Sequence, residues 1–377
     1  MRGWPSPGSV VPLIVIGCGG APPPTASLMG RLSAGAGHTC AAADDGTVSC
    51  WGSNPDGQLG NGTEVDSRSA TRVRGLAGVR EVAAGSYHTC ARGSDASVSC
   101  WGWNVGGQIG DRMIANRLEP FGLPDLSAGA LAMGSYHSCA LLADGSERCW
   151  GQNDYGQLGD GSEINSGMPV GVFSLPPSTA IAAGGRHSCA RLADRTVQCW
   201  GGNDVGELGD GTTVAHSFPE PVAGVTDAIA IAAGFNHSCA LREGGQVTCW
   251  GANGYGQLGD GTTTDSALPV AVVGLQGAVA IAAGYNHNCA ILATRELRCW
   301  GWNAAGQLGN GSMVDSPTPV AATGLTDVTA VAGGGFHTCA AIAGGAVSCW
   351  GSNDSGQLGD GTTTDRASPA PVAGVRL

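Results

Sequence analysis

The fold is decided by the stretch Ala283-Gly284-Tyr285-Asn286-His287-Asn288-Cys289-Ala290 and by its continuation, Cys299-Trp300-Gly301-Trp302-Asn303-Ala304-Ala305-Gly306-Gln307-Leu308-Gly309. His-x-Cys recurs seven times along the 377 residues, at intervals of 50 residues apart from one of 49: Cys40, Cys90, Cys139, Cys189, Cys239, Cys289 and Cys339. Ten residues after each of these comes a second cysteine followed by Trp-Gly: Cys50, Cys100, Cys149, Cys199, Cys249, Cys299 and Cys349. A fixed period of this length indicates a repeat architecture.

Each repeat contains four short apolar segments separated by turn residues. In the sixth repeat these segments are 268–274, 278–284, 287–292 and 297–300, and a loop rich in Gly and Asn follows at 301–311. The chain has 65 Gly and 19 Pro with only 13% charged residues, which suits short strands joined by tight turns better than amphipathic helices. Four strands in each of seven repeats predict an all-β fold, a seven-bladed β-propeller of four-stranded blades.

The repeat also resembles a known family. The pattern Ala-Gly-x-x-His-x-Cys-Ala with Cys-Trp-Gly-x-Asn-x-x-Gly-Gln-Leu-Gly is similar to the regulator of chromosome condensation repeat, and the similarity extends from about residue 30 to residue 377. Ile109 replaces Leu, Glu207 replaces Gln, and Asp111-Arg112-Met113 lacks the Asp-Gly turn, so we expect an altered loop in the second blade. The resemblance implies a propeller that binds proteins, as the bacterial type II β-lactamase inhibitor proteins do.

The two ends of the repeat array suggest how the ring closes. The first repeat starts at Leu28-Met29-Gly30-Arg31-Leu32 with no Pro-Val segment before it, whereas the last repeat is followed by Pro371-Val372-Ala373-Gly374-Val375. We expect this C-terminal strand to complete the first blade, which would leave no unpaired blade edge.

The N-terminal residues predict export. Residues 1–17 have a basic start and a short apolar run, typical of a secretory signal, and the run is too short to span a bilayer. Val15-Ile16-Gly17-Cys18 resembles the bacterial lipobox, so we expect lipidation of Cys18, a Pro/Gly-rich tether over 18–27 and a propeller over 28–377. Gly19 favours the outer membrane, facing the periplasm or the cell surface. The alternative is that Cys18 is an unmodified odd cysteine.

The remaining 14 cysteines form seven pairs. Asp44-Asp45-Gly46 is a turn signal midway between Cys40 and Cys50, so the two cysteines should face each other across a hairpin. In an exported protein this arrangement predicts one disulfide in each blade. The alternative is zinc, for which His-x-Cys and the second Cys would supply three ligands.

Other repeated residues have structural explanations. His38, His88, His137, His187, His237, His287 and His337 recur in every repeat, so we interpret each as a buried ring that hydrogen-bonds within its blade, and we interpret the Trp of each Cys-Trp-Gly as packing. Asp260 to Asp265 and Asp360 to Asp365 offer oxygens to calcium, although a turn explains them too. No catalytic constellation, metal site or cofactor motif stands out from the repeat, which indicates a non-enzyme.

One set of aromatic residues varies from repeat to repeat. Chain direction places the Gly-x-x-His loops and the loops after Trp-Gly on the same face of the disc, and nine aromatics occupy variable positions in them: Tyr87, Trp103, Tyr136, Tyr155, Phe235, Tyr255, Tyr285, Trp302 and Phe336. Tyr and Trp on rigid loops are typical of interface hot spots. These residues predict a binding face, with packing between blades as the alternative.

These observations favour a cell-envelope binding scaffold. Its expected partner is an envelope or extracellular protein, and the membrane is contacted only through the anchor. A polysaccharide ligand is the alternative, since the same aromatics would stack on sugars. A guanine-nucleotide exchange factor, the activity of the family founder, would require a cytosolic small GTPase. The net charge of −12 with scattered Arg excludes nucleic acid, and we expect a monomer.

Overall fold

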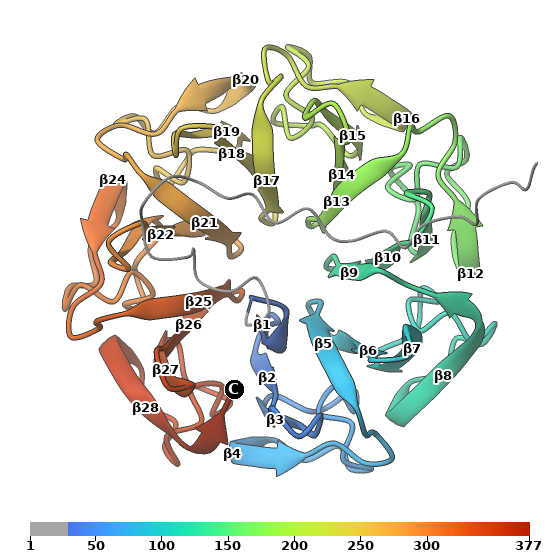
Figure 1. Cartoon of the computed structure of the whole chain (residues 1–377), viewed down its shortest axis with the longest axis vertical. Helices are drawn as coiled ribbons and strands as arrows, with labels where there is room; N and C mark the ends of the chain where they lie inside the picture. Colours follow the sequence, from blue (N-terminus) through green and yellow to red (C-terminus); the bar gives the residue numbers. More distant parts are fainter. Residues whose placement is uncertain (1–28) are drawn as a thin grey trace, which may run out of the picture.

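The computed structural model describes residues 29–377 and forms a closed disc of seven four-stranded antiparallel sheets around a central axis (Figure 1). This confirms the predicted seven-bladed β-propeller. The proposed signal (1–17), Cys18 and the tether (18–27) lie outside the described residues. A short 3-10 helix, η1 (Met29–Arg31), precedes the first strand.

Each blade consists of four strands that are consecutive in the chain. Their bounds are β1 (Leu32–Ala34), β2 (His38–Ala42), β3 (Val48–Gly52) and β4 (Ser67–Arg72); β5 (Val79–Ala84), β6 (His88–Gly93), β7 (Ser97–Gly102) and β8 (Arg117–Ser127); β9 (Ala130–Met133), β10 (His137–Leu141), β11 (Glu147–Gly151) and β12 (Ser166–Gly171); β13 (Ser178–Ala183), β14 (His187–Leu192), β15 (Val197–Gly201) and β16 (His216–Pro221); β17 (Ala228–Ala233), β18 (His237–Arg242), β19 (Val247–Gly251) and β20 (Ser266–Ala271); β21 (Ala278–Ala283), β22 (His287–Leu292), β23 (Leu297–Gly301) and β24 (Ser316–Ala321); β25 (Val328–Gly333), β26 (His337–Ile342), β27 (Ala346–Gly351) and β28 (Arg366–Arg376).

The two middle strands of each blade carry the cysteines. In the sixth blade Cys289 on β22 is the register partner of Cys299 on β23, and the two are joined by a disulfide with Cα atoms 4.0 Å apart. The same bond is present in all seven blades, as predicted. Because these sulfur atoms are bonded to each other, they are not thiolate ligands for zinc.

The predicted route of ring closure is wrong. The C-terminal strand β28 pairs with β27 of its own blade, where Cys349 faces Ala370, and the first blade is complete with β1 to β4. The Pro-Val segment is therefore the last, outermost strand of a blade and not the first. Closure comes from side-by-side packing of the first and seventh blades, which share one apolar cluster that includes Leu32, Trp51 and Leu358.

Each seam between blades is built around the repeated tryptophan. Trp350 of the seventh blade is fully buried and packs with Leu308 of the sixth blade. Its Nε1–H donates to the backbone oxygen of Gln307 at 2.8 Å. The interpretation of these tryptophans as packing residues is confirmed, and the repeated Gln-Leu dipeptide is their receptor on the preceding blade.

The seven repeated histidines are buried, as predicted, but they bond to the next blade and not within their own. Thr338 donates its hydroxyl to the Gln307 oxygen, so its own oxygen accepts from His287 Nε2 at 2.8 Å. Asn288 also links a histidine to a backbone oxygen of the preceding blade. Its Nδ2 donates to the Gln257 oxygen, and its Oδ1 accepts from His237 Nε2. The pairs close a ring: His38–Thr89, His88–Ser138, His137–Ser188, His187–Ser238, His237–Asn288, His287–Thr338 and His337–Thr39.

Burial determines the charge state of this ring of histidines. Desolvation lowers the pKa of each imidazole to about 3 or about 4, so all seven are neutral at neutral pH. The repeated Gly three residues before each histidine, in the strand-to-strand loop, leaves room for the ring. At Gly284 a Cβ would lie 2.2 Å from Cε1 of the histidine ring and 2.4 Å from the Gly334 oxygen.

Candidate functional site

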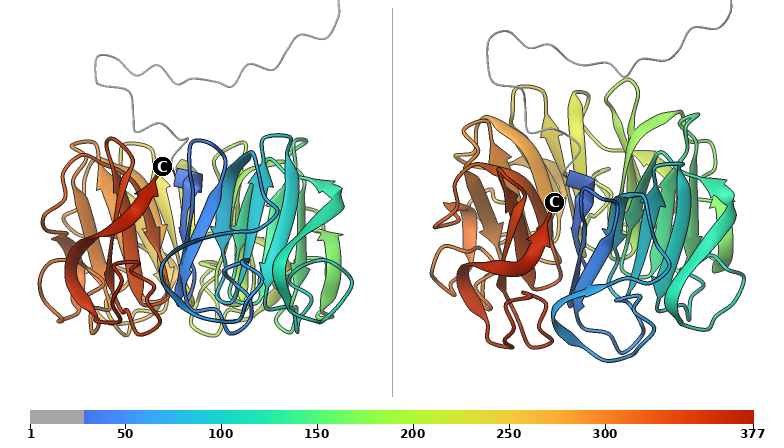
Figure 2. Two further views of the ribbon diagram at one scale, coloured as in Figure 1. Left: turned by 90° about the horizontal axis from the view of Figure 1, so that it is seen from below. Right: turned by 60° about the horizontal axis from the view of Figure 1, so that its bottom comes forward.

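Two sets of loops share one face of the disc, which we call the loop face. In every blade the first strand runs toward this face and the second runs away, and the third runs toward it again. The first-to-second and third-to-fourth loops therefore meet there, as predicted. Figure 2 shows the disc from the side, with η1 and the C-terminal residue on the opposite face.

The long loop of the loop face is rigid because it wraps around a buried asparagine. Asn253 donates from Nδ2 to oxygens of Asp260, Thr262 and Thr264, and its Oδ1 accepts from Leu258 N at 2.8 Å. The amide nitrogen occupies the centre of an oxygen cage, so these oxygens are already used without calcium. Within residues 29–377 no group of three or more His, Cys, Asp or Glu side chains is arranged to hold a metal.

The second blade keeps this loop, contrary to the expected alteration. Arg112 stands where other repeats have Gly, and it adopts the same left-handed backbone with φ 66°. Its N–H donates to the Gly167 oxygen, as Gly211 N–H donates to the Ala267 oxygen in the fourth blade. Asp111 accepts from Asn104 Nδ2 and thereby retains the cage. The hydrogen bonds fix the loop, and the arginine bears the backbone strain.

The nine predicted aromatics all lie on the loop face, and eight of them form two clusters. The first cluster is a triangle in which Tyr87, Trp103 and Tyr136 have ring centroids 5.8–6.4 Å apart. The second is a chain of neighbouring rings, Phe235, Tyr285, Phe336, Trp302 and Tyr255, with centroids 4.9–6.0 Å apart. The ninth, Tyr155, carries the Arg186 guanidinium 4.6 Å above its ring.

These clusters cross the seams between blades and still reach the surface. Tyr255, Tyr87 and Phe336 are the most exposed, at 44%, 38% and 38%, and the other six side chains are half-buried. The contacts between rings are those that the packing alternative predicts, and the exposed edges leave the binding interpretation a prediction. The rings support one another laterally and present their outer edges on a single face.

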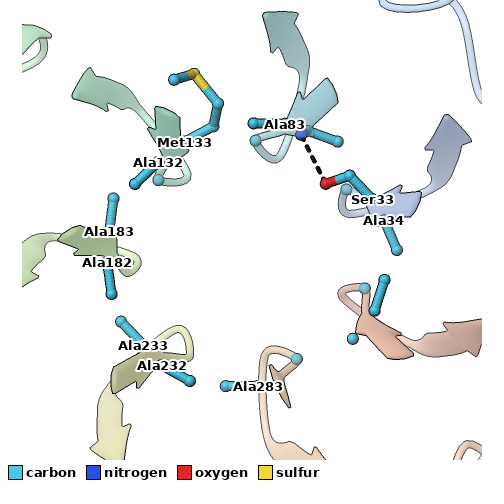
Figure 3. A pocket seen from close by; sticks show the side chains of 18 of the residues that line it. Ser33, Ala34, Ala83, Ala132, Met133, Ala182, Ala183, Ala232, Ala233 and Ala283 are labelled. Atoms are coloured by element: carbon cyan, nitrogen blue, oxygen red, sulfur yellow. Dashed lines mark hydrogen bonds between the residues drawn. The ribbon is translucent and has the colours of Figure 1, made fainter. Parts of the chain in front are cut away.

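Tyr285 has a further role at the centre of the disc. Its hydroxyl hydrogen-bonds Ser86, so a side chain from the sixth blade reaches the second blade across the axis. Burial raises the pKa of Tyr285 to about 12. Behind it lies a central cavity of about 340 Å³ lined by the inner strands, whose walls are mainly alanine and glycine, with Met133 and Ser33 among the few larger or polar side chains (Figure 3).

Two features were missed by the sequence analysis. Phe173 and Phe218 form an exposed ring pair on the rim of the disc, with centroids 5.4 Å apart. Glu147 is buried at a position where the other six repeats have Val or Leu. Both departures from the repeat are visible when the seven units are aligned with one another, which is the signal that could have identified them.

The fold and this face define a class of protein: a tandem-repeat β-propeller whose variable residues collect on one loop face. The RCC1-like domain model matches residues 131–376, and models of the regulator of chromosome condensation (RCC1) repeat match residues 45–92, 31–58 and 79–108. The chain therefore belongs to the RCC1-like domain family. In residues 29–377 no helix is long and apolar enough to cross a membrane.

Solved structures share the fold at low sequence identity. Prp20p of Saccharomyces cerevisiae, which binds Gsp1p and histones, has a TM-score of 0.77 at 22% identity, over 91% of this chain and 87% of its own. Human WBSCR16 has a TM-score of 0.75 at 24% identity, over 87% of this chain and 94% of its own. The ectodomain of the Physcomitrella patens receptor kinase CR4 has a TM-score of 0.54 at 21% identity, over 86% and 73%. No curated protein matches the sequence.

Proposed function

We propose that this protein is a non-enzymatic binding scaffold of the cell envelope, whose loop face captures a protein partner. The observation that carries the proposal is the aromatic set of that face: eight rings braced against each other in two clusters, each with part of its surface exposed. Braced rings lose little side-chain entropy on binding, which is what gives Tyr and Trp their large share of interface energy. Prp20p, a relative in fold, binds Gsp1p and histones.

The proposal includes the anchor. Lipidation of Cys18 would attach a monomeric propeller to the outer membrane. In Figure 2, η1 lies on the face opposite the loop face. A tether that enters there would place the loop face, with its aromatic clusters, on the side of the disc away from the bilayer. Labelling with a palmitate analogue should tag the wild type and not Cys18→Ala, and an unlabelled wild type would contradict the anchor.

The binding face is tested by site-specific photocrosslinking in native envelopes. A crosslinking amino acid at Trp103 or Trp302 should trap a discrete protein adduct. The same residue placed at Thr294, which is exposed on a turn of the opposite face, is the matched control and should not. Adducts from position 294 alone, or from none, would contradict the proposal.

The captured partner then allows affinities to be measured. Trp103→Ala and Trp302→Ala should weaken its binding about tenfold or more and leave the melting temperature nearly unchanged. Phe173→Ala, which removes a more exposed ring from the rim, should bind normally. Unchanged affinity in both tryptophan variants, or a crosslinked polysaccharide in place of a protein, would contradict a protein-binding loop face.

A further inference from the structure

The outer rim of the disc carries a set of exposed apolar side chains on, or within two residues of, the outermost strands of three consecutive blades. It consists of Met168, Phe173, Phe218, Leu268 and Val273, which are 43%, 56%, 44%, 51% and 52% exposed, and we call it the rim patch. Its centre is the seam between the third and fourth blades, where the rings of Phe173 and Phe218 meet edge to face. These two phenylalanines belong to neither aromatic cluster of the loop face.

Comparison of equivalent positions around the ring shows that the repeat does not require this patch. Arg74 and Glu119 occupy the positions of Phe173 and Phe218 at the seam between the first and second blades, and they form an ion pair at 3.0 Å. Phe218 and Leu268 occupy equivalent positions in the fourth and fifth blades. The same position holds Thr318 in the sixth blade and Ser368 in the seventh. Since an ion pair occupies the equivalent seam between the first and second blades, packing does not require two exposed phenylalanines here.

The backbone beneath the patch restricts how a partner can bind. The outermost strands β12, β16 and β20 are blade edges, and each contains a proline at the same position: Pro169, Pro219 and Pro269. Proline lacks the N–H that an added strand would use, so strand addition is blocked at these points. A partner must therefore be held through side chains.

The charge around the patch specifies the partner's chemistry. Segments 160–175, 210–225 and 260–275 contain Asp160, Glu163, Asp210, Glu220, Asp260 and Asp265 and no Lys or Arg. The basic side chains beside these segments lie at the third-blade border: exposed Arg148 on β11 is the register partner of Gly171, and the loop of Arg112 lies against Gly167. An acidic border around an apolar centre favours a partner in which basic side chains flank apolar ones. It disfavours a second copy of this chain, which has a net charge of −12.

We propose that the rim patch is a second docking surface, which binds a protein segment whose apolar side chains are flanked by Lys or Arg. Phe173 and Phe218 form its centre, and the acidic loops beside them select the basic flanks. The surface lies on the side of the disc, so it is separate from the loop face, and one propeller could hold two partners at once.

The test uses the full chain and a labelled synthetic peptide in which Leu and Trp alternate with Arg, with a second peptide in which Glu replaces Arg. The matched variant is Phe173→Arg combined with Phe218→Glu, which copies the native Arg74–Glu119 pair and leaves the net charge unchanged. Fluorescence anisotropy should show that the basic peptide binds the wild type about tenfold or more tightly than it binds this variant. A photocrosslinker in the peptide should label segments 160–175 or 210–225.

Other outcomes would overturn the proposal. Equal binding by wild type and variant, equal binding of the Glu peptide, or crosslinks confined to the loop face would each do so. Wild-type dimers in analytical ultracentrifugation that the variant abolishes would assign the patch to self-association. Trp103→Ala with Trp302→Ala should leave peptide binding unchanged, so that failure here and failure of the loop-face proposal are distinguishable.

Discussion

Glu147 offers the most quantitative prediction, because one buried carboxyl interrupts an otherwise apolar position. Its side chain is almost fully buried, Ser178 donates a hydrogen bond to Oε1, and Oε2 is buried without a partner. Burial raises the pKa of Glu147 from 4.5 to about 8. The equivalent residues of the other blades are Val48, Val98, Val197, Val247, Leu297 and Val347, all buried.

The raised pKa of Glu147 determines how stability depends on pH. Between pH 4.5 and about 8 the folded protein keeps the carboxyl proton while the unfolded chain has released it. The free energy of unfolding therefore falls as pH rises, by about 1.4 kcal/mol for each pH unit between the two pKa values. Over the whole interval the ionisation of Glu147 lowers the free energy of unfolding by about 5 kcal/mol. Below pH 4.5 the carboxyl is protonated in both states, so this destabilisation is absent.

The test replaces Glu147 by Val, with Glu147→Gln as the matched control. Urea unfolding of the oxidised protein should show Glu147→Val more stable than the wild type by about 1–3 kcal/mol near pH 5, because it removes an unsatisfied buried oxygen. The difference should grow by several kcal/mol by pH 8. Glu147→Gln should lose the dependence on pH without the constant gain. A difference that is independent of pH, or a less stable valine variant, would show that Glu147 is not a buried carboxyl with a raised pKa.

Four further predictions concern the repeat itself. Arg112→Gly should raise the free energy of unfolding by about 1 kcal/mol in urea titrations, because it relieves a left-handed residue. Gly284→Ala should cost about 3 kcal/mol or more, since its Cβ would approach the histidine ring to 2.2 Å, whereas Gly254→Ala meets no atom within 4 Å and should be neutral. Replacing both Cys289 and Cys299 by Ala should cost about 2–3 kcal/mol. The seven imidazoles, whose pKa values burial lowers to about 3 or 4 from 6.5, stabilise the fold above pH 6.5 and should make it unfold cooperatively on acidification below that pH, as followed by circular dichroism. A change in the free energy of unfolding of the opposite sign in any of these variants would contradict the contact on which its prediction rests. A fold that resists acid would contradict the burial of the histidine ring.

The repeat allowed the fold to be predicted, but it did not show which strand begins each blade. Seven Cys pairs at a fixed spacing define seven hairpins, and the disulfides followed from the same spacing. A tandem repeat, however, looks the same whichever strand is taken as first, so the Pro-Val strand was assigned to the following blade. Only its hydrogen bonds to β27 reveal where a blade ends.

The same ambiguity affected the histidines. A residue that recurs every 50 positions can bond within its own unit or to the next unit, and the period is identical in both cases. The polar residue after each histidine, such as Thr338 or Asn288, is the partner, and its side chain reaches the preceding blade. The loop-face aromatics were located correctly because chain direction alone determines the face. Their mutual contacts depend on blade geometry, which no single repeat contains.

Hydrogen exchange of the full chain, with and without the partner captured by crosslinking, tests directly whether the loop face binds a protein. We predict slower exchange on binding in the loops that carry the aromatics, segments 85–88, 103–116, 285–287 and 302–315, with unchanged exchange in the turns 143–146 and 293–296 of the opposite face. Protection confined to those turns, or no protection in the aromatic loops, would contradict a protein-binding loop face.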